Sequence, residues 1–236
     1  MGKKIAIYGA GTIGACQATL TSGNGYSTVV IGHSEEGLSR CRNTMLQNWN
    51  DLIAQKLATA ANRRAAMDLV TITNDVSALR DCDIVFEAVS EDVNIKQRVY
   101  SIITEVCGRD IIVVSTTSSI DAAILAEKIE NPARFLIAHP FQPVHMLPLV
   151  EVVRHTETSE ETLNQVCTLL KDLNRQVVML NRSVPGFLVN RFAQALFRES
   201  IYLIEQGITT AADIDRAIKY AVGMRYASIG LLEYYD

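Results

Sequence analysis

Short apolar runs alternate with helix-like stretches along most of the chain. An apolar run of about four to eight residues bounded by turn residues is typical of a buried strand, whereas apolar positions that recur about every three or four residues indicate a helix. The expected strands are 4–8, 27–31, 70–73, 83–89, 111–114, 135–138, 149–153 and 176–180. The expected helices are 12–20, two within 35–67, a short turn at 76–79, 94–106, 121–129 and 159–173. This alternation predicts a mostly parallel sheet covered on both faces.

The pattern changes at Ser183-Val184-Pro185-Gly186, which we interpret as a domain boundary. We therefore expect a first domain at 1–184 and a helical domain at 185–236, with helices at 187–205 and 211–221. A segment this short seldom closes a core alone, yet its apolar residues fall on more than one helix face. These residues are Phe187, Leu188, Phe192, Leu196, Phe197, Ile201, Leu203 and Ile204. We expect a homodimer built mainly through these helices.

The first strand runs directly into Gly9-Ala10-Gly11-Thr12-Ile13-Gly14. This GxGxxG motif is weak evidence alone, but between a strand and a helix it favours a dinucleotide site. Gly9 permits a tight turn, Gly11 lets the backbone approach a pyrophosphate, and Gly14 lets helix and strand pack closely. Thr12 and Ile13 begin the helix whose N-terminus would face the phosphates. The alternative is a glycine-rich turn that binds nothing.

The second strand ends in Gly32-His33-Ser34, without the acid that would accept the ribose hydroxyls of NAD. Gly32 would not repel a 2′-phosphate, and Ser34, Arg40 or Arg42 could bind one. Glu35 and Glu36 argue the other way if either turns inward. NAD and NADP therefore both stay open.

A loop rich in proline separates the strands 135–138 and 149–153. His139 begins this loop, and Glu151 interrupts the second apolar run. A carboxylate there is costly unless a partner compensates it. A His oriented by a Glu is a suitable general base. The alternative is a surface His and an edge-strand Glu that faces water.

Four features of the sequence follow the ends of expected strands. They are the glycine motif after 4–8, Glu91 after 83–89, Ser118 after 111–114 and His139 after 135–138. Ligands of parallel sheets bind beyond the carboxyl ends of the strands. The shared placement therefore predicts one site that contains all four.

Composition excludes several classes of protein. A net charge of −4 without a basic stripe gives nucleic-acid binding little support, and no apolar stretch approaches a transmembrane span. The five cysteines are scattered singly, without metal-ligand spacing. They predict reduced thiols, no metal site and a cytoplasmic protein.

Taken together, these residues resemble the 3-hydroxyacyl-CoA dehydrogenase family from residue 4 to the end. The resemblance is carried by GAGTIG, FEAVSEDVNIK, TTSS, the HPF and LVEV block, and PGFLVNR. It implies a Rossmann-type, doubly wound, mostly parallel α/β sheet with a helical extension, followed by a small all-α C-terminal domain. It also implies NAD, slightly favoured over NADP.

The resemblance implies roles for individual residues. Ser118, His139, Glu151 and Asn190 match the family's catalytic set. The implied cofactor contacts are the glycine motif, Gly32, His33, Ser34, Glu91, Lys96, Ser118 and Gln142. Gln142 stands where an Asn is usual near the nicotinamide.

The tail 223–230 and the His139-Pro140-Phe141 order look more like the L-gulonate dehydrogenase (lambda-crystallin) and carnitine dehydrogenase branch. The family usually continues beyond the point where this sequence stops, so we expect the helical domain to be incomplete. Arg225 could pair with a substrate carboxylate, or form a structural ion pair with Asp213 or Asp215.

The implied chemistry is hydride transfer between a nicotinamide cofactor and the 3-hydroxy or 3-oxo group of a small hydroxy acid. A 3-hydroxyacyl-CoA thioester such as 3-hydroxybutyryl-CoA is the alternative substrate. Two alternatives to an enzyme are a structural protein of the crystallin kind and a nucleotide-sensing module. The His139 and Glu151 pair argues against the structural protein, which need not retain it.

Overall fold

The computed structural model describes residues 3–236 of the chain. The chain divides into two compact units, Met1–Phe187 and Leu188–Asp236.

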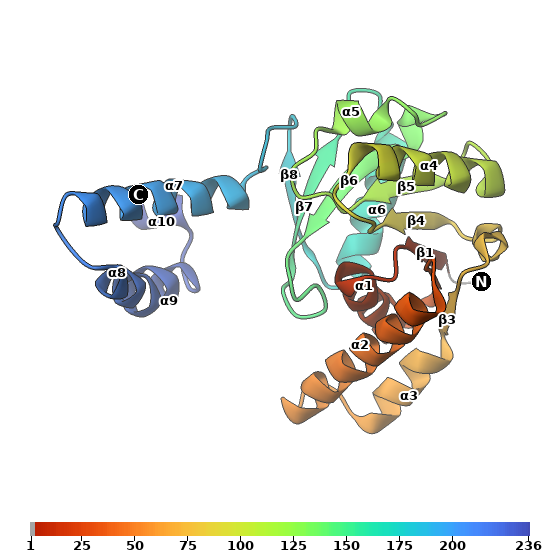
Figure 1. The fold of residues 1–236 in the computed structure, drawn as a ribbon, viewed down its shortest axis with the longest axis horizontal. Coiled ribbons are helices and arrows are strands. Elements are labelled where there is room, and N and C mark those ends of the chain that lie inside the picture. Colours follow the sequence, from red (N-terminus) through yellow and green to blue (C-terminus); the bar gives the residue numbers. More distant parts are fainter. Residues whose placement is uncertain (1–2) are drawn as a thin grey trace. The chain divides into compact units, whose positions relative to one another are not determined.

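The first unit is built on an eight-stranded sheet with strand order β3-β2-β1-β4-β5-β6-β7-β8 (Figure 1). The strands are β1 (Lys4–Tyr8), β2 (Ser27–Ile31), β3 (Val70–Thr73), β4 (Ile84–Glu87), β5 (Ile112–Ser115), β6 (Phe135–Pro140), β7 (Leu149–Arg154) and β8 (Gln176–Leu180). All neighbours pair in parallel except β6 and β7, which are antiparallel. The predicted mostly parallel, doubly wound sheet is confirmed.

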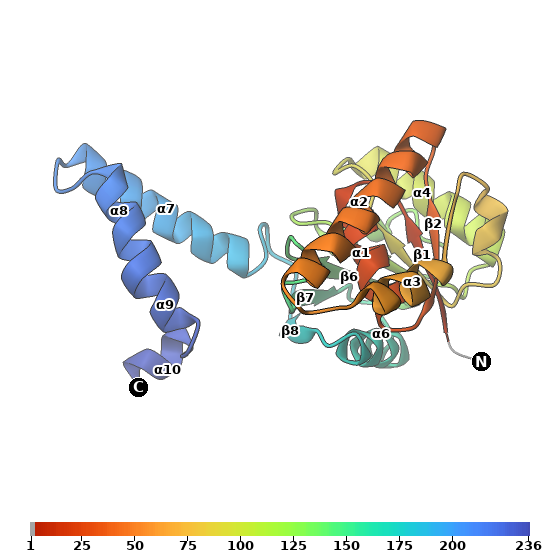
Figure 2. The ribbon, with the colours of Figure 1, turned by 90° about the horizontal axis from the view of Figure 1, so that it is seen from below.

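Helices cover both faces of this sheet (Figures 1 and 2). The core on one face takes apolar residues from α1, α2 and α6, and the core on the other takes them from α4 and α5. The helices of this unit are α1 (Thr12–Gly23), α2 (Glu35–Ala54), α3 (Ala60–Asp68), α4 (Val93–Cys107), α5 (Ala122–Ala126) and α6 (Glu160–Asp172). Short 3₁₀ turns lie at Val76–Leu79 and Pro132–Arg134.

Strand β1 explains why the apolar runs are continuous. Ile5 and Ile7 belong to one core and Ala6 to the other, because successive side chains of a strand point to opposite faces. A strand buried on both faces needs apolar residues throughout. The sheet therefore follows directly from the sequence pattern.

Three of the differences from the predicted bounds bear on the site or on the boundary between the units. Strand β6 continues through His139 to Pro140, because the antiparallel ladder with β7 extends to the Pro140 and Val150 pair. Helix α5 is shorter than 121–129, since Asp121 is its cap and accepts a hydrogen bond from the Ala123 amide. Helix α7 does not include Phe187, which has a φ of +47° and is buried in the first unit.

The second unit consists of α7 (Val189–Glu205), α8 (Ala211–Ala217), a π turn (Ile218–Val222), α9 (Gly223–Tyr226) and α10 (Leu231–Tyr235). The expected helix 211–221 thus continues, through the π turn, to Tyr226. Thr210 caps α8 by accepting a hydrogen bond from the Asp213 amide. No residue of these helices is buried.

All five cysteines are free thiols: three are buried and two are partly buried. Burial raises the pKa of Cys41 and of Cys82 to about 11 each, which makes both poor nucleophiles. Within residues 3–236, no helix combines the length and the apolar character that a membrane crossing requires.

Candidate active site

His139 and Glu151 lie directly opposite each other in the antiparallel ladder of β6 and β7. Directly opposite residues of such a ladder project from the same face. The His139 Nδ1 is therefore brought to 2.9 Å from the Glu151 Oε2. The Glu151 side chain is fully buried, and that of His139 is 8% exposed.

This pairing fixes the orientation of the imidazole. A carboxylate can only accept a hydrogen bond, so Nδ1 carries the proton and Nε2 keeps the lone pair of the neutral ring. The rings of Phe141 and Phe187 pack against His139, with centroids 4.6 Å and 5.6 Å away. The arrangement leaves one basic nitrogen on a ring held from two sides.

The glycine motif forms a tight loop between β1 and α1. Gly9 has a φ of +131°, and a β-carbon there would lie 2.4 Å from the Ala88 carbonyl oxygen. A β-carbon at Gly14 would lie 1.8 Å from the Gly9 carbonyl oxygen. A β-carbon at Gly11 would meet nothing within 4 Å, so there the backbone faces open space.

Gly11 is also the N-cap of α1, and no side chain caps this helix or places an acid in its first turn. The helix N-terminus is therefore open to an anion. Open space at Gly11 and uncapped amides beside it fit the pyrophosphate of a dinucleotide. Thr12 and Ile13 form the first turn of this helix.

Gly32 follows the end of β2, and its predicted contact to the cofactor stays a prediction. A β-carbon on Gly32 would lie 2.6 Å from Leu38 Cδ2 and 2.8 Å from Ala10 Cβ, so this position packs against the glycine loop. His33 is exposed and is the residue at this strand end with a side chain free to meet a ribose. The Ser34 Oγ caps α2 by accepting from the Gly37 amide at 3.2 Å.

The charged residues considered for a 2′-phosphate have other contacts. Arg40 forms an ion pair with Glu36 on the outer face of α2. Glu35 accepts a hydrogen bond from Asn74 at 3.2 Å, and Arg42 is exposed. His33 is thus the strongest candidate contact to the ribose.

Glu91 organises the turn after β5. Its Oε1 accepts hydrogen bonds from Thr117 Oγ1 at 2.5 Å and from the Ser118 amide at 3.0 Å. Oε1 is also 3.4 Å from Ser118 Oγ and 3.3 Å from Ser119 Oγ. Burial favours a raised pKa for Glu91, but the Thr117 bond, the Lys96 charge and the Ser118 amide outweigh it, and the pKa is lowered.

Lys96 is buried beside Glu91, with only 1% of its side chain exposed. Its Nζ lies 2.8 Å from Glu87 Oε1 and 3.2 Å from Glu91 Oε2. It also donates to the Val89 carbonyl at 3.4 Å. The donors of this ammonium are directed into the protein.

A cavity of about 370 Å³ lies beside the glycine loop and the β6–β7 loop. Its lining includes Gln142, which is exposed, and Thr12 at the start of α1. The other lining residues are Cys16, Thr44, Asn48, Asp51, Pro143, His145 and Met146. Asp51 is the charged residue of this lining. The volume of the cavity suits a small ligand.

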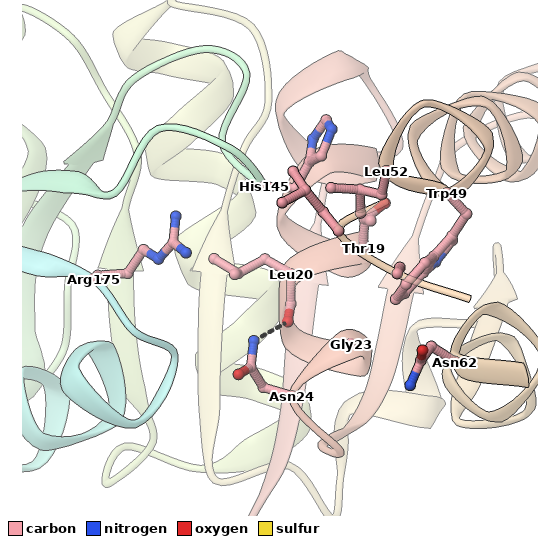
Figure 3. A pocket seen from close by; sticks show the side chains of 11 residues that line it. Thr19, Leu20, Gly23, Asn24, Trp49, Leu52, Asn62, His145 and Arg175 are labelled. Carbon is pink, nitrogen blue, oxygen red and sulfur yellow. Dashed lines mark hydrogen bonds between the residues drawn. The ribbon is translucent and has the colours of Figure 1, made fainter. Parts of the chain in front are cut away.

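His145 also lines a second cavity of about 250 Å³ at the other end of α1 (Figure 3). Trp49 and Arg175 line it too, and Figure 3 shows these two side chains on opposite sides of Leu20. Burial lowers the pKa of His145 below its ordinary value.

Comparison with known proteins decides the family. The model for the NAD-binding domain of 3-hydroxyacyl-CoA dehydrogenase matches residues 4–183, and the model for the C-terminal domain matches residues 186–236. The chain belongs to the 3-hydroxyacyl-CoA dehydrogenase family. It is therefore an oxidoreductase with a domain for a nicotinamide cofactor.

Three relatives illustrate the range of this family. An L-carnitine dehydrogenase from Bacillus cereus is 32% identical over 229 residues, which cover 97% of this chain and 69% of that protein. A solved (S)-3-hydroxybutyryl-CoA dehydrogenase from Ralstonia eutropha is 28% identical, with a TM-score of 0.88 over 94% of this chain and 78% of that one. A solved 5-formyl-3-hydroxy-2-methylpyridine 4-carboxylic acid 5-dehydrogenase, an NAD⁺-dependent dismutase, is 31% identical, with a TM-score of 0.90 over 99% and 75%.

Two family-derived residues lie in the second unit. Asn190 is in the first turn of α7, and its role stays a prediction. Arg225 is on α9, with its guanidinium carbon 4.3 Å from the centre of the Tyr234 ring. Of Asp213 and Asp215, the two alternative ion-pair partners considered for Arg225, Asp213 instead binds Arg216 at 2.7 Å.

Sequence reasoning missed Glu87 and Thr117. Glu87 is fully buried and binds Lys96, while Thr117 makes the shortest of the hydrogen bonds to Glu91 described above. The signal for Glu87 was present, because it is a carboxylate inside an apolar run, as Glu151 is. Thr117 gives no such signal, since hydroxyl residues are frequent in loops.

Proposed function

We propose that this protein oxidises the secondary hydroxyl of a small 3-hydroxy acid, reversibly, with a nicotinamide cofactor. The observation that carries the proposal is the buried His139 and Glu151 pair, with Nδ1 and Oε2 2.9 Å apart. His139 lies near the carboxyl end of β6, at the same edge of the sheet as the glycine loop after β1. A general base next to a dinucleotide site is what alcohol oxidation requires.

His139 acts as the base in this proposal. Its Nε2 takes the hydroxyl proton, and the Glu151 carboxylate stabilises the imidazolium through the bond to Nδ1. Ser118 and Asn190 hold the substrate oxygen as hydrogen-bond donors, which stabilises charge that develops there. The bound nicotinamide supplies the hydride chemistry. In the reverse direction, the imidazolium returns the proton.

We propose NAD over NADP as the cofactor. Glu35 stands in the first turn of α2, two residues after His33, and its charge would repel a 2′-phosphate bound there. Arg40, which could have bound that phosphate, is paired with Glu36. The family model is that of an NAD-binding domain, and one relative is described as NAD⁺-dependent. His33 carries no carboxylate that would repel a 2′-phosphate, so NADP stays the alternative.

We propose a free acid over a CoA thioester as the substrate. Arg225 is the carboxylate partner in this proposal, with Tyr234 supporting its guanidinium. The cavity beside Gln142 has no lysine or arginine among its lining residues, so it offers no counter-charge to the phosphates of a coenzyme. Two relatives are named for carnitine and for a pyridine carboxylic acid rather than for a thioester.

A substrate panel tests this function. The purified protein is assayed with NAD and with NADP against free 3-hydroxy acids and their CoA thioesters, with His139→Ala as the blank. Turnover of free acids with NAD, and a KM about tenfold or more higher in Arg225→Ala, is the expected result. Preference for thioesters would favour a 3-hydroxyacyl-CoA dehydrogenase, and rates equal to the blank would contradict an enzyme of this class.

We also propose a cytoplasmic homodimer. The five free thiols support a reducing compartment. The exposed apolar residues of α7 support a second copy as their cover, among them Phe192, Leu196 and Phe197, which are 49–60% exposed. The family resemblance supports the same contact.

A further inference from the structure

The cavity of about 370 Å³ beside the glycine loop has one wall that is formed by helix α2. Thr44, Asn48 and Asp51 line the cavity from this helix. They are spaced by about one turn, so they lie on one face of the helix. A hydroxyl, an amide and a carboxylate therefore follow one another along the same wall.

The amide of Asn48 is held in one orientation. The residue is 7% exposed, and its Nδ2 lies 3.1 Å from Thr19 Oγ1 and 3.6 Å from Cys16 Sγ. Thr19 Oγ1 donates its hydrogen to the Ala15 carbonyl oxygen at 2.9 Å, so it can only accept from Asn48. The hydrogen bonds therefore turn the nitrogen of this amide toward α1.

The oxygen of the same amide faces the cavity. Within residues 3–236, Asn48 Oδ1 receives no hydrogen bond, although the residue is buried. This atom is not sealed in the interior, as Trp49 Nε1 is, so it opens into the cavity that Asn48 lines. A buried polar atom without a partner calls for one. A ligand that satisfies this carbonyl oxygen must carry a hydrogen-bond donor.

Asp51 adds a negative charge to the same wall. Its Oδ1 accepts from Gln47 Nε2 at 2.8 Å. In the described part of the chain it forms no ion pair, and the lining of the cavity contains no Lys or Arg. A carboxylate next to an unpartnered carbonyl oxygen suits an ammonium, which brings both a positive charge and N–H donors.

We propose that the substrate is a 3-hydroxy acid that carries a primary ammonium group, and that Asn48 and Asp51 select it. The ammonium donates to Asn48 Oδ1 and to the Asp51 carboxylate. A methyl group in its place would leave both oxygens without a donor, and a trimethylammonium group would bring the charge without an N–H. The inference rests on the proposed function, because it specifies the substrate of that site.

Matched substrates test this proposal. The ammonium substrates are 4-amino-3-hydroxybutanoate and 5-amino-3-hydroxypentanoate. Their methyl counterparts are 3-hydroxypentanoate and 3-hydroxyhexanoate. For the better chain length, kcat/KM should be about 30-fold or more higher with the ammonium than with the methyl group. A ratio near one, or a preference for the trimethylammonium analogue, would overturn the proposal.

Two substitutions locate the effect on α2. Asp51→Asn and Asn48→Leu should each lower the ratio of the two kcat/KM values about fivefold or more, because each removes one contact to the ammonium. The ratio is measured within one preparation, so a loss of folded protein cancels. Unchanged ratios in both variants would overturn the proposal.

Asp68→Asn is the matched control. Asp68 is an exposed carboxylate on α3 that does not line the cavity. Its substitution removes the same charge as Asp51→Asn does, and the ratio should stay at the wild-type value. An equal fall of the ratio in Asp68→Asn would show that net charge, rather than the wall of the cavity, selects the ammonium, and would overturn the proposal.

Binding measures the same contacts without turnover. A hydroxy acid cannot react with NADH, so calorimetry on the NADH-bound protein gives the dissociation constants of the ammonium and methyl acids directly. A protein that binds the ammonium acid more tightly but oxidises no hydroxy acid contradicts the proposed function alone. Equal affinities for the two acids overturn the present proposal, whatever the activity. Binding of neither acid overturns both.

Discussion

The two units of this chain use their apolar residues in opposite ways. In Met1–Phe187 the strands are buried on both faces, and two cores collect the apolar residues of the flanking helices. In Leu188–Asp236 no helical residue is buried, although α7 is strongly amphipathic and rich in Phe, Leu and Ile. Similar residue types therefore give a closed core in one unit and an uncovered surface in the other.

The difference teaches that apolar content does not by itself make a domain. A sheet pairs strands that are far apart in sequence, so it can be covered on both faces by its own helices. A few short helices bury too little area to compensate for the lost conformational entropy. The first unit carries the proposed base and nucleotide loop, and the second needs a cover that its own fold does not supply.

The largest expected effect tests whether the chemistry belongs to the first unit. His139→Ala should lower kcat by about two orders of magnitude or more, because it removes the general base. The dissociation constant for NADH should change little, since His139 is not part of the glycine loop. Steady-state kinetics and calorimetry on the same preparation measure both. Near-normal turnover would remove His139 from the mechanism.

The next prediction tests the exposed surface of the second unit. Phe197 is 60% exposed, and Phe197→Asp should weaken a homodimer about 30-fold or more if this ring is an interface anchor. Light scattering over a concentration series measures the effect. Leu57→Asp is the matched control, because Leu57 is 65% exposed but lies in the first unit. A wild-type monomer at micromolar concentration would show that no second copy covers α7.

A smaller effect is expected at the ribose end of the nucleotide site. His33→Asp should raise the preference for NAD over NADP by about tenfold, because a carboxylate accepts ribose hydroxyls and repels a 2′-phosphate. Titrating both cofactors measures the ratio. Gly32→Asp is the informative comparison, since its β-carbon would meet Leu38 and Ala10 and should mainly lower stability. An unchanged ratio in His33→Asp would place His33 away from the ribose.

The smallest effect concerns pH. The pKa of Glu91 is lowered from its ordinary value of 4.5, so its contribution to stability is complete above that value and is lost as the pH falls through the lower, folded-state pKa. The melting temperature of the wild type should therefore exceed that of Glu91→Gln by a constant amount from pH 8 to about 5. The gap should close below about pH 4. A gap that closes near neutral pH would contradict the lowered pKa.

Much of the first unit can be predicted from local pattern alone. Strands β1, β2, β3 and β8 have their predicted bounds, because turn residues such as glycine and asparagine delimit their apolar runs. The glycine motif predicts its own loop for the same reason. Its spacing encodes a turn, an open backbone and a close packing contact, all within one short segment.

The candidate site is predictable where a charged residue interrupts an apolar run. Glu151 inside an apolar run demands a partner, and His139 stands at the end of the preceding apolar run. Glu87 follows the same logic, but its partner Lys96 lies on a different element and gives no local signal. The pattern therefore marks buried charges without identifying what compensates them.

The sequence by itself determined the succession of strands and helices along the chain, the nucleotide loop and the family. These depend on periodicity and spacing over a few tens of residues. Only the tertiary structure decided that β6 and β7 place His139 opposite Glu151, that Gly32 packs against Ala10, and that Arg225 stacks on Tyr234. Such contacts depend on strand register and on packing between separate elements. The same hydrophobic pattern is compatible with more than one strand register and with more than one packing arrangement, so the pattern alone does not select between them.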